Sequence, residues 1–165
     1  MSSYMPPMQD EEGLVDFCEI SPELSRDFRG LRLWLPIKLL GIGPFRNNLD
    51  EKFDLARLAT ERLRAMDNIE IVAEPQLSIV AFRYRDGRDV GELNQFNRDL
   101  LDRVNGKKRV WLTGTMLGDR FVIRICVLSF RTHLDRIEAA LEDLEHAIAE
   151  MARLPIEKGR ERGNL

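Results

Sequence analysis

The sequence predicts an α+β fold in which a small, mainly antiparallel sheet is covered by helices on one face. Apolar periodicity changes along the chain in the order helix, helix, strand, strand, helix, strand, strand, helix. Short turns separate the paired strands, which is typical of antiparallel hairpins. The length of 165 residues suits a single domain that buries about 70% of its unfolded surface.

Residues 1–20 are predicted to be an extended arm, and residues 21–44 a linking helix. Ser21 is a suitable hydroxyl cap, and Pro22 fits the first turn, where no amide donor is needed. Apolar side chains then recur at helical spacing on one face. Pro36 is expected to kink this helix, because it lacks an amide donor and crowds the previous turn.

Residues 45–154 are predicted to form the α+β domain itself, followed by a flexible tail over 155–165. The domain opens with a helix over about residues 45–66. Two segments rich in Ile, Val and aromatics, 69–75 and 77–85, then have the character of strands. The apolar side of the opening helix is predicted to comprise Phe45, Leu49, Phe53, Ala56, Leu63 and Met66.

The second half of the domain repeats this arrangement. Apolar spacing predicts a helix over residues 90–104. RVWLTGTML (109–117) and RFVIRICVLSF (120–130) are predicted to form a β-hairpin, because a Gly-Asp turn separates them. Thr132 is a suitable cap for a long final helix.

Composition excludes several classes of function. Lys and Arg total 25 against 28 Asp and Glu, so the net charge of −3 gives no basic field for nucleic acid. No apolar run approaches the roughly 20 residues of a membrane span, so we expect no membrane partner. The N-terminus lacks a basic start and an apolar signal core, which favours a cytoplasmic location. Cys18 and Cys126 match no metal-ligand spacing, so no metal site is expected.

FVIRICVLSF, residues 121–130, places one arginine inside an apolar strand. Because side chains alternate along a strand, Val122, Arg124 and Cys126 share one face. An unpaired charge there would cost several kcal/mol, on the order set by desolvation. Arg124 therefore either forms an ion pair within the fold or presents its planar fork to a ligand carboxylate or phosphate.

The linking helix carries a candidate interface. Its arginines recur every three residues, and this row is either a solvated face or binds acidic residues of a partner. The apolar stripe on the same helix is wider than one packed neighbouring element would cover. The predicted interface residues are Arg26, Arg29, Arg32, Leu33, Trp34 and Ile37. No catalytic constellation is evident in the sequence: Thr113-Gly114-Thr115 lacks the phosphate-loop pattern.

Several segments resemble a known family. ELSRDFRGLRLWLPIKLLG (23–41), LSIVAFRYR (77–85) and LTGTMLGDRFVIRICVLSFRTH (112–133) are similar, in this order, to segments of the pyridoxal-phosphate-dependent amino-acid decarboxylases of the aromatic-amino-acid and glutamate decarboxylase group. The resemblance covers roughly residues 4–150. It implies the carboxy-terminal small domain of fold-type-I pyridoxal-phosphate enzymes. The segment LSIVAFRYR resembles a family strand that ends in Phe-Arg, and Phe82 and Arg83 match that ending.

The resemblance implies part of a decarboxylase, a carboxy-lyase of amino-acid metabolism. In the intact family enzyme a large domain binds pyridoxal 5'-phosphate through a lysine that follows a histidine. This chain has no His-Lys pair among its five lysines, so no covalently bound cofactor is expected and the chain alone should be inactive. Arg124 corresponds to a family arginine that faces the active-site cleft, where it can meet the substrate carboxylate.

The implied partners are the large cofactor-binding domain, on the same or another chain, an amino-acid substrate and further copies in a homo-oligomer such as a dimer. One alternative stays open because the catalytic machinery is missing. The chain could be a non-enzymatic module that binds an acidic metabolite through Arg124 or that mediates oligomerisation.

Overall fold

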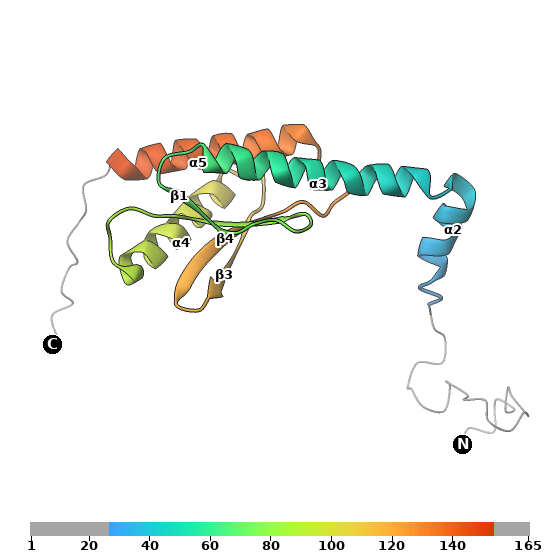
Figure 1. Ribbon diagram of the computed structural model, residues 1–165, viewed down its shortest axis with the longest axis horizontal. Helices are drawn as coiled ribbons and strands as arrows, with labels where there is room; N and C mark the ends of the chain where they lie inside the picture. The colour runs from blue at the N-terminus through green and yellow to red at the C-terminus, as the bar shows by residue number, and fades with distance from the viewer. Residues whose placement is uncertain (1–26, 154–165) are drawn as a thin grey trace, which may run out of the picture. The chain divides into compact units, whose positions relative to one another are not determined.

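The computed structural model describes residues 27–153, and the predicted arm, the start of the linking helix and the tail lie outside this range. The chain divides into two compact units with their boundary between Gly43 and Pro44. The first contains helix α2 (Leu31–Leu40), and the second contains all elements from α3 to α5 (Figure 1).

Helix α2 is shorter than the predicted linking helix over 21–44. Residues 27–30 are not helical, and Gly30 occupies the N-cap position without a side-chain cap. Glycine has poor helix propensity, so it favours a helix boundary at this point. At the other end Gly41 adopts a φ of 76°, a left-handed conformation that ends the helix. Pro36 lies inside α2, as the sequence predicts.

Helix α3 (Gly43–Arg64) buries the predicted Ala56 and Leu63 in its second half but not the side predicted for its first half. Its buried residues are Lys52, Leu55, Ala56, Ala59, Thr60 and Leu63. Phe53 is half-buried, and Leu49 is 55% exposed. The prediction for the first half of the helix was therefore wrong.

The four strands form one antiparallel sheet in the order β1-β2-β4-β3. A two-residue turn joins β3 to β4, between the paired residues Leu117 and Arg120. Gly118 supplies the positive φ of 62° that such a turn requires. The predicted hairpin is confirmed, although both strands are shorter than predicted. The bounds are β1 (Ile69–Ala73), β2 (Ile79–Tyr84), β3 (Thr113–Leu117) and β4 (Arg120–Cys126).

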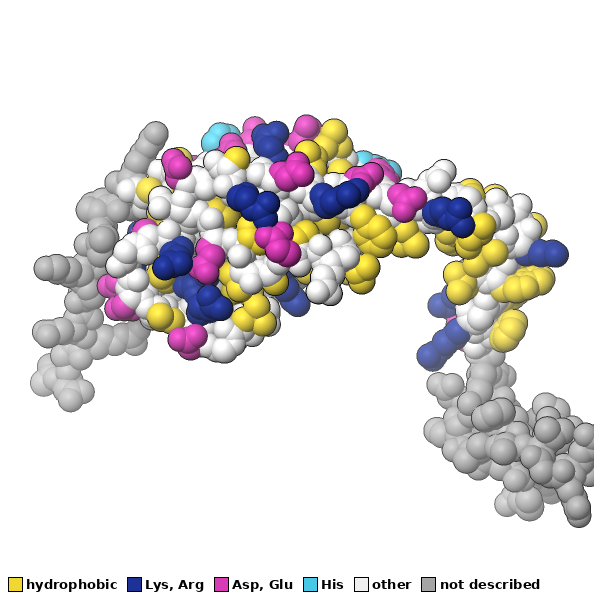
Figure 2. Space-filling model, in the orientation of Figure 1, with side chains coloured by type: hydrophobic (Ala, Val, Ile, Leu, Met, Phe, Trp, Pro, Cys, Tyr) yellow, Lys and Arg dark blue, Asp and Glu magenta, His cyan; other side chains and the backbone are white. Residues whose placement is uncertain are grey.

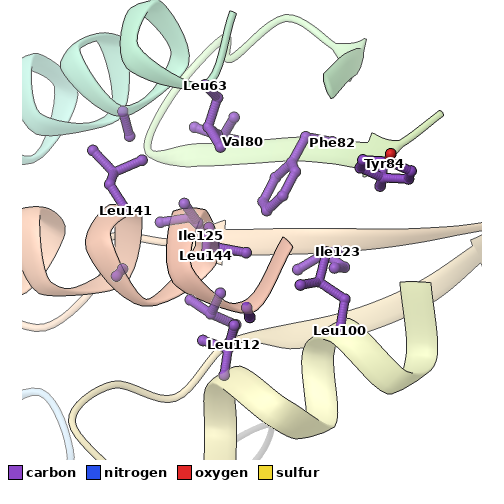
Figure 3. Close-up of a cluster of buried hydrophobic side chains, with 14 of the residues drawn as sticks. Leu63, Val80, Phe82, Tyr84, Leu100, Leu112, Ile123, Ile125, Leu141 and Leu144 are labelled. Carbon is purple, nitrogen blue, oxygen red and sulfur yellow. The ribbon is translucent and has the colours of Figure 1, made fainter. Parts of the chain in front are cut away.

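Helices α3, α4 (Val90–Gly106) and α5 (Leu134–Arg153) share one hydrophobic core with the sheet. The strands contribute the alternate residues Val80, Phe82, Ile123 and Ile125, which all point to the same face. Figure 3 shows Leu63 of α3, Leu100 of α4 and Leu144 of α5 directed at these side chains. The α+β class with an antiparallel sheet and helices on one face is confirmed.

Two asparagines of α4 take the place of strand partners where β2 and β4 separate. The ladder between them ends at the pair Phe82 and Ile123, and continuing its register would place Tyr84 opposite Phe121. Instead, the Tyr84 amide donates to Asn97 Oδ1 at 2.7 Å, and Asn97 Nδ2 donates to the Tyr84 carbonyl at 3.0 Å. The Phe121 amide donates to Asn94 Oδ1 at 2.7 Å. These bonds satisfy buried backbone groups and fix α4 against the sheet.

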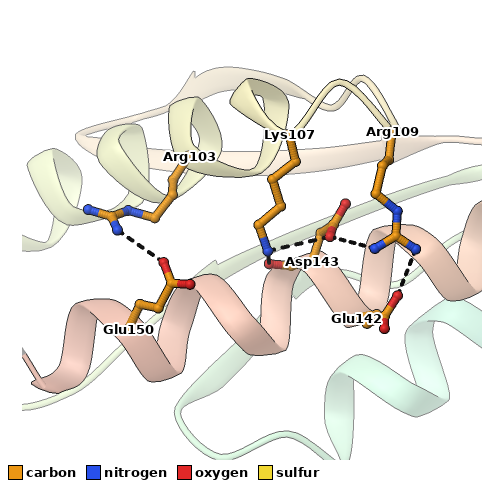
Figure 4. A network of polar contacts seen from close by, with 6 residues as sticks. All are labelled: Arg103, Lys107, Arg109, Glu142, Asp143 and Glu150. Carbon is orange, nitrogen blue, oxygen red and sulfur yellow. Dashed lines mark hydrogen bonds and ion pairs between the residues drawn. The ribbon is translucent and has the colours of Figure 1, made fainter.

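A network of ion pairs joins the end of α4 to α5 (Figure 4). Its centre is Asp143, which is 1% exposed and lies 3.0 Å from Arg109 Nη1 and 3.4 Å from Lys107 Nζ. Arg109 also binds Glu142 at 2.7 Å, and that bond holds the pKa of the Glu142 carboxyl below its ordinary range. The acid at the centre is nearly inaccessible to water, so its cationic partners are needed to stabilise it.

Candidate functional site

The face of the sheet opposite the core carries the strand arginines. In the antiparallel register Arg124 lies opposite Ala81, and Arg83 lies opposite Glu70. Cross-strand partners point to the same side, and so do residues two apart on one strand. Arg83 and Arg124 therefore share the face opposite Val80, Phe82, Ile123 and Ile125, together with the buried Ala81 and Val122.

The structure gives Arg124 no acidic partner among residues 27–153. It is half-buried, and its Nε atom is shielded from water without a hydrogen-bond partner. Glu70 is the acid that the four strands place on this face, and its carboxylate lies 3.4 Å from Arg120 and 4.0 Å from Arg85. An ion pair with an acid of the described fold, one of the two alternatives for Arg124, is therefore not formed.

The surroundings of Arg124 combine polar side chains with apolar ones. Thr113 is its partner on β3, and the Thr113 hydroxyl lies 3.9 Å from the Cys126 thiol. Toward the ends of β2 and β4 the exposed side chains become apolar, with Ile79 43% and Leu128 68% exposed. A ligand with a carboxylate and an apolar body fits this order of side chains, because the guanidinium fork binds the former and the apolar side chains the latter.

The predicted interface residues of the first unit are largely exposed. Helix α2 buries no residue, and hydrophobic side chains cover much of its surface (Figure 2). Leu33 and Trp34 are 60% and 57% exposed, whereas Ile37 is half-buried. Arg29 is exposed, and Arg32 forms an exposed ion pair with Asp27 at 2.6 Å. Arg26 lies outside the described residues.

The lysines of the described range do not fit a cofactor that is held through a free buried amine. Lys52 is 2% exposed, but its Nζ donates to the Thr132 carbonyl at 2.6 Å and to Glu51 at 2.7 Å. Lys107 binds Asp143, and Lys38 and Lys108 are exposed. Lys52 thus joins α3 to the segment before α5.

A pair of titratable groups lies next to this lysine. His133 Nδ1 is 2.7 Å from Glu51 Oε1, and the hydrogen bonds of His133 and then of Lys52 hold the pKa of the Glu51 carboxyl below its ordinary value. Glu51 is therefore ionised and bound, which makes it a poor acid or base. The described residues contain no group of His, Cys, Asp or Glu that could hold a metal ion. None of the helices in this range is long and apolar enough to cross a membrane.

Sequence reasoning did not single out Arg83 as a site residue, although it is the most deeply buried arginine of the face. It is 2% exposed, and its Nε and Nη2 atoms have no hydrogen-bond partner within residues 27–153. The signal was present in LSIVAFRYR, where Arg83 alternates with Phe82 and Tyr84 as Arg124 does with its neighbours. A charge near the end of a strand usually indicates that the strand leaves the core there. Arg83 was therefore not recognised as a buried charge.

Comparisons with known proteins agree on one family. The description "Pyridoxal-dependent decarboxylase conserved domain" matches residues 4–85. Aromatic-L-amino-acid decarboxylase of Bacillus atrophaeus is 34% identical over 73% of this chain, and tyrosine decarboxylase 3 of Petroselinum crispum is 31% identical over 86%. The structure of Catharanthus roseus tryptophan decarboxylase in complex with L-tryptophan superimposes with a TM-score of 0.70 and 26% identity, over 76% of this chain.

The matches cover only part of each relative. The chain spans 26% of the Bacillus protein, 29% of the Petroselinum protein and 27% of the Catharanthus structure. The ordered segments that resemble this family, the antiparallel sheet with its helices on one face and the agreement of sequence and structural relatives lead to the same conclusion. The chain belongs to the pyridoxal-dependent decarboxylase family.

Proposed function

We propose that this chain acts as the carboxy-terminal small domain of an amino-acid decarboxylase, in which Arg124 binds the substrate carboxylate. The observation that carries the proposal is a guanidinium, on the sheet face opposite the core, that no acid of residues 27–153 pairs and whose Nε is shielded from water. A carboxylate is the ligand that matches a planar fork of donors in such a place. The relatives named above are decarboxylases of amino acids, which does not support the alternative of a non-enzymatic module.

The cofactor belongs to another part of the proposed enzyme. Pyridoxal phosphate, when bound, supplies the electron sink that accepts the bonding pair as carbon dioxide leaves. The described residues of this chain contribute binding and orientation instead. Arg124 is held on a strand between two neighbours, so its guanidinium can fix the substrate carboxylate without reorganising the backbone.

The first unit supplies the proposed contact with the large domain. A helix that exposes Leu33, Trp34 and other apolar residues on several sides is unusual in a monomeric domain. We infer that residues 21–44 link this domain to a large cofactor-binding domain, and that residues 45–154 form the small domain. The division between Gly43 and Pro44 supports this assignment. A homo-oligomer and a cytoplasmic location remain predictions, which sedimentation analysis and cell fractionation would check.

A chimaera tests the role of Arg124. Residues 44–153 would replace the aligned region of the Bacillus atrophaeus decarboxylase, and decarboxylation of aromatic amino acids would be followed by carbon dioxide release. Arg124→Gln should reduce kcat/KM about 10- to 100-fold, because a hydrogen bond to a charged group contributes about 1.5–3 kcal/mol. Arg57→Gln is the matched control, since Arg57 forms an exposed ion pair with Asp54 on α3. An active chimaera in which both variants retain full kcat/KM would refute the proposal.

The isolated chain tests the assignment of the cofactor to another domain. After incubation with pyridoxal phosphate and borohydride, mass spectrometry should find no stoichiometric pyridoxyl group on a single lysine. The buried Lys52 amine is the critical case, because its hydrogen bonds to Thr132 and Glu51 withhold it from reaction. A stoichiometric adduct at one lysine would show that this chain holds the cofactor itself.

A further inference from the structure

A second arginine lies beside Arg124 on the face opposite the core. Arg124 is opposite Ala81 on β2, and Arg83 follows Ala81 by two residues. The two arginines are thus diagonal neighbours on one face, with about 7–8 Å between such positions. Long side chains reach across that distance, so both guanidinium groups can meet one bound molecule or two adjacent groups.

The environment of Arg83 is that of an anion-binding side chain and not that of a solvated surface charge. It is 2% exposed, and two of its guanidinium nitrogens have no hydrogen-bond partner in the part of the chain that the structure describes. The nearest acid in register is Glu70 on β1, but its carboxylate is directed to Arg120 at 3.4 Å and to Arg85 at 4.0 Å. A buried cation without an ion pair among the described residues is costly, which favours a carboxylate ligand from outside these strands.

We propose that Arg83 and Arg124 form one paired-cation site for carboxylates, in which Arg83 binds a carboxylate other than the one proposed for Arg124. The inference rests on the proposed function only for the role of Arg124. The shared chemistry is a carboxylate held bidentately by the Arg83 fork. Its source is either the second carboxylate of one bound molecule or a separate carboxylate, such as an acidic side chain of the large domain.

Arginine side-chain NMR on the intact chain tests the site. The Nε–Hε resonances of Arg83, Arg124 and Arg103 would be assigned by through-bond correlation to the assigned backbone of the wild-type chain and followed during titration with acetate, with glutarate and with neutral acetamide. Both Arg83 and Arg124 should shift saturably with the acids and not with acetamide. Arg103 is the internal control, because it already binds Glu150 at 3.1 Å. The measurement uses the wild-type chain, so it does not depend on whether an Arg83 variant folds.

The outcomes separate the two sources and the two proposals. Glutarate affinity at least tenfold above acetate, with both resonances shifting together, supports a single bridging molecule. Equal affinities, with the two resonances saturating independently, support two separate carboxylates. A shift of Arg124 alone overturns the paired site and leaves the proposed function standing. A shift of Arg83 alone, or of neither arginine, overturns the paired site and counts against the proposed role of Arg124.

Discussion

Replacing Asn97 with alanine should destabilise the fold more than any exposed substitution on the same helix. Asn97 is fully buried, and its amide bonds both backbone groups of Tyr84, at 2.7 and 3.0 Å, as well as the Leu93 carbonyl at 2.7 Å. Alanine cannot replace these bonds, so a donor and an acceptor of Tyr84 lose their partner. Each such buried group costs about 1–3 kcal/mol, and we expect a loss of about 2–5 kcal/mol in the free energy of unfolding.

Urea unfolding followed by circular dichroism measures this loss. The total stability of a domain is typically about 5–15 kcal/mol, so the midpoint for Asn97→Ala should shift by a large fraction of its value. Gln95→Ala is the matched control on α4, because its side chain bonds only the exposed Asp99 and should change stability by less than about 0.5 kcal/mol. A loss below about 1 kcal/mol for Asn97→Ala, with an unchanged m-value, would refute the reasoning that this amide replaces a strand partner.

Three further variants test other contacts. Gly114→Ala should lower the free energy of unfolding by about 1–3 kcal/mol in urea melts, because the new Cβ would lie 2.2 Å from the Phe121 ring; wild-type stability would contradict the close approach. Asp143→Ala should cost about 1–3 kcal/mol in the same assay, since its cationic partners are partly exposed and can be hydrated. Glu142→Gln should reduce the loss of stability in acid. The Glu142 pKa is lowered by Arg109 from an ordinary value of 4.5, so its contribution is present above pH 4.5 and is lost as the pH falls through the folded pKa. Equal acid sensitivity of variant and wild type between pH 7 and pH 3 would exclude this contribution.

Much of the fold follows from local patterns. The order of helices and strands, the hairpin and the antiparallel class depend on the spacing of apolar residues and on one Gly-Asp turn, which are properties of neighbouring residues. The turn requires a positive φ, and Gly118 supplies it. The same alternation identified Arg124 as a charge within an apolar strand, which is why the candidate site could be located before its surroundings were known.

The missed features depend on contacts between distant residues. Lys52 reads as a surface residue, yet its amine reaches the Thr132 carbonyl, 80 residues away, and its stem is buried. Asn97 has the residue type of an exposed helix position, and only the early separation of β2 and β4 makes it a core residue. The predicted side of α3 was wrong in the first half of the helix for a similar reason, because apolar spacing alone does not decide which of two overlapping faces the neighbours cover.

The exposure of both tryptophans gives the molecule two built-in optical reporters. Trp34 on α2 is 57% exposed, and Trp111, just before β3, is 79% exposed. Indoles that are already hydrated emit at long wavelength whether or not the chain is folded, so intrinsic fluorescence will barely register denaturation. Any body that covers either ring will instead move the emission toward the blue. The Trp34→Phe and Trp111→Phe variants each leave a single tryptophan, so the emission of each variant reports on one surface alone.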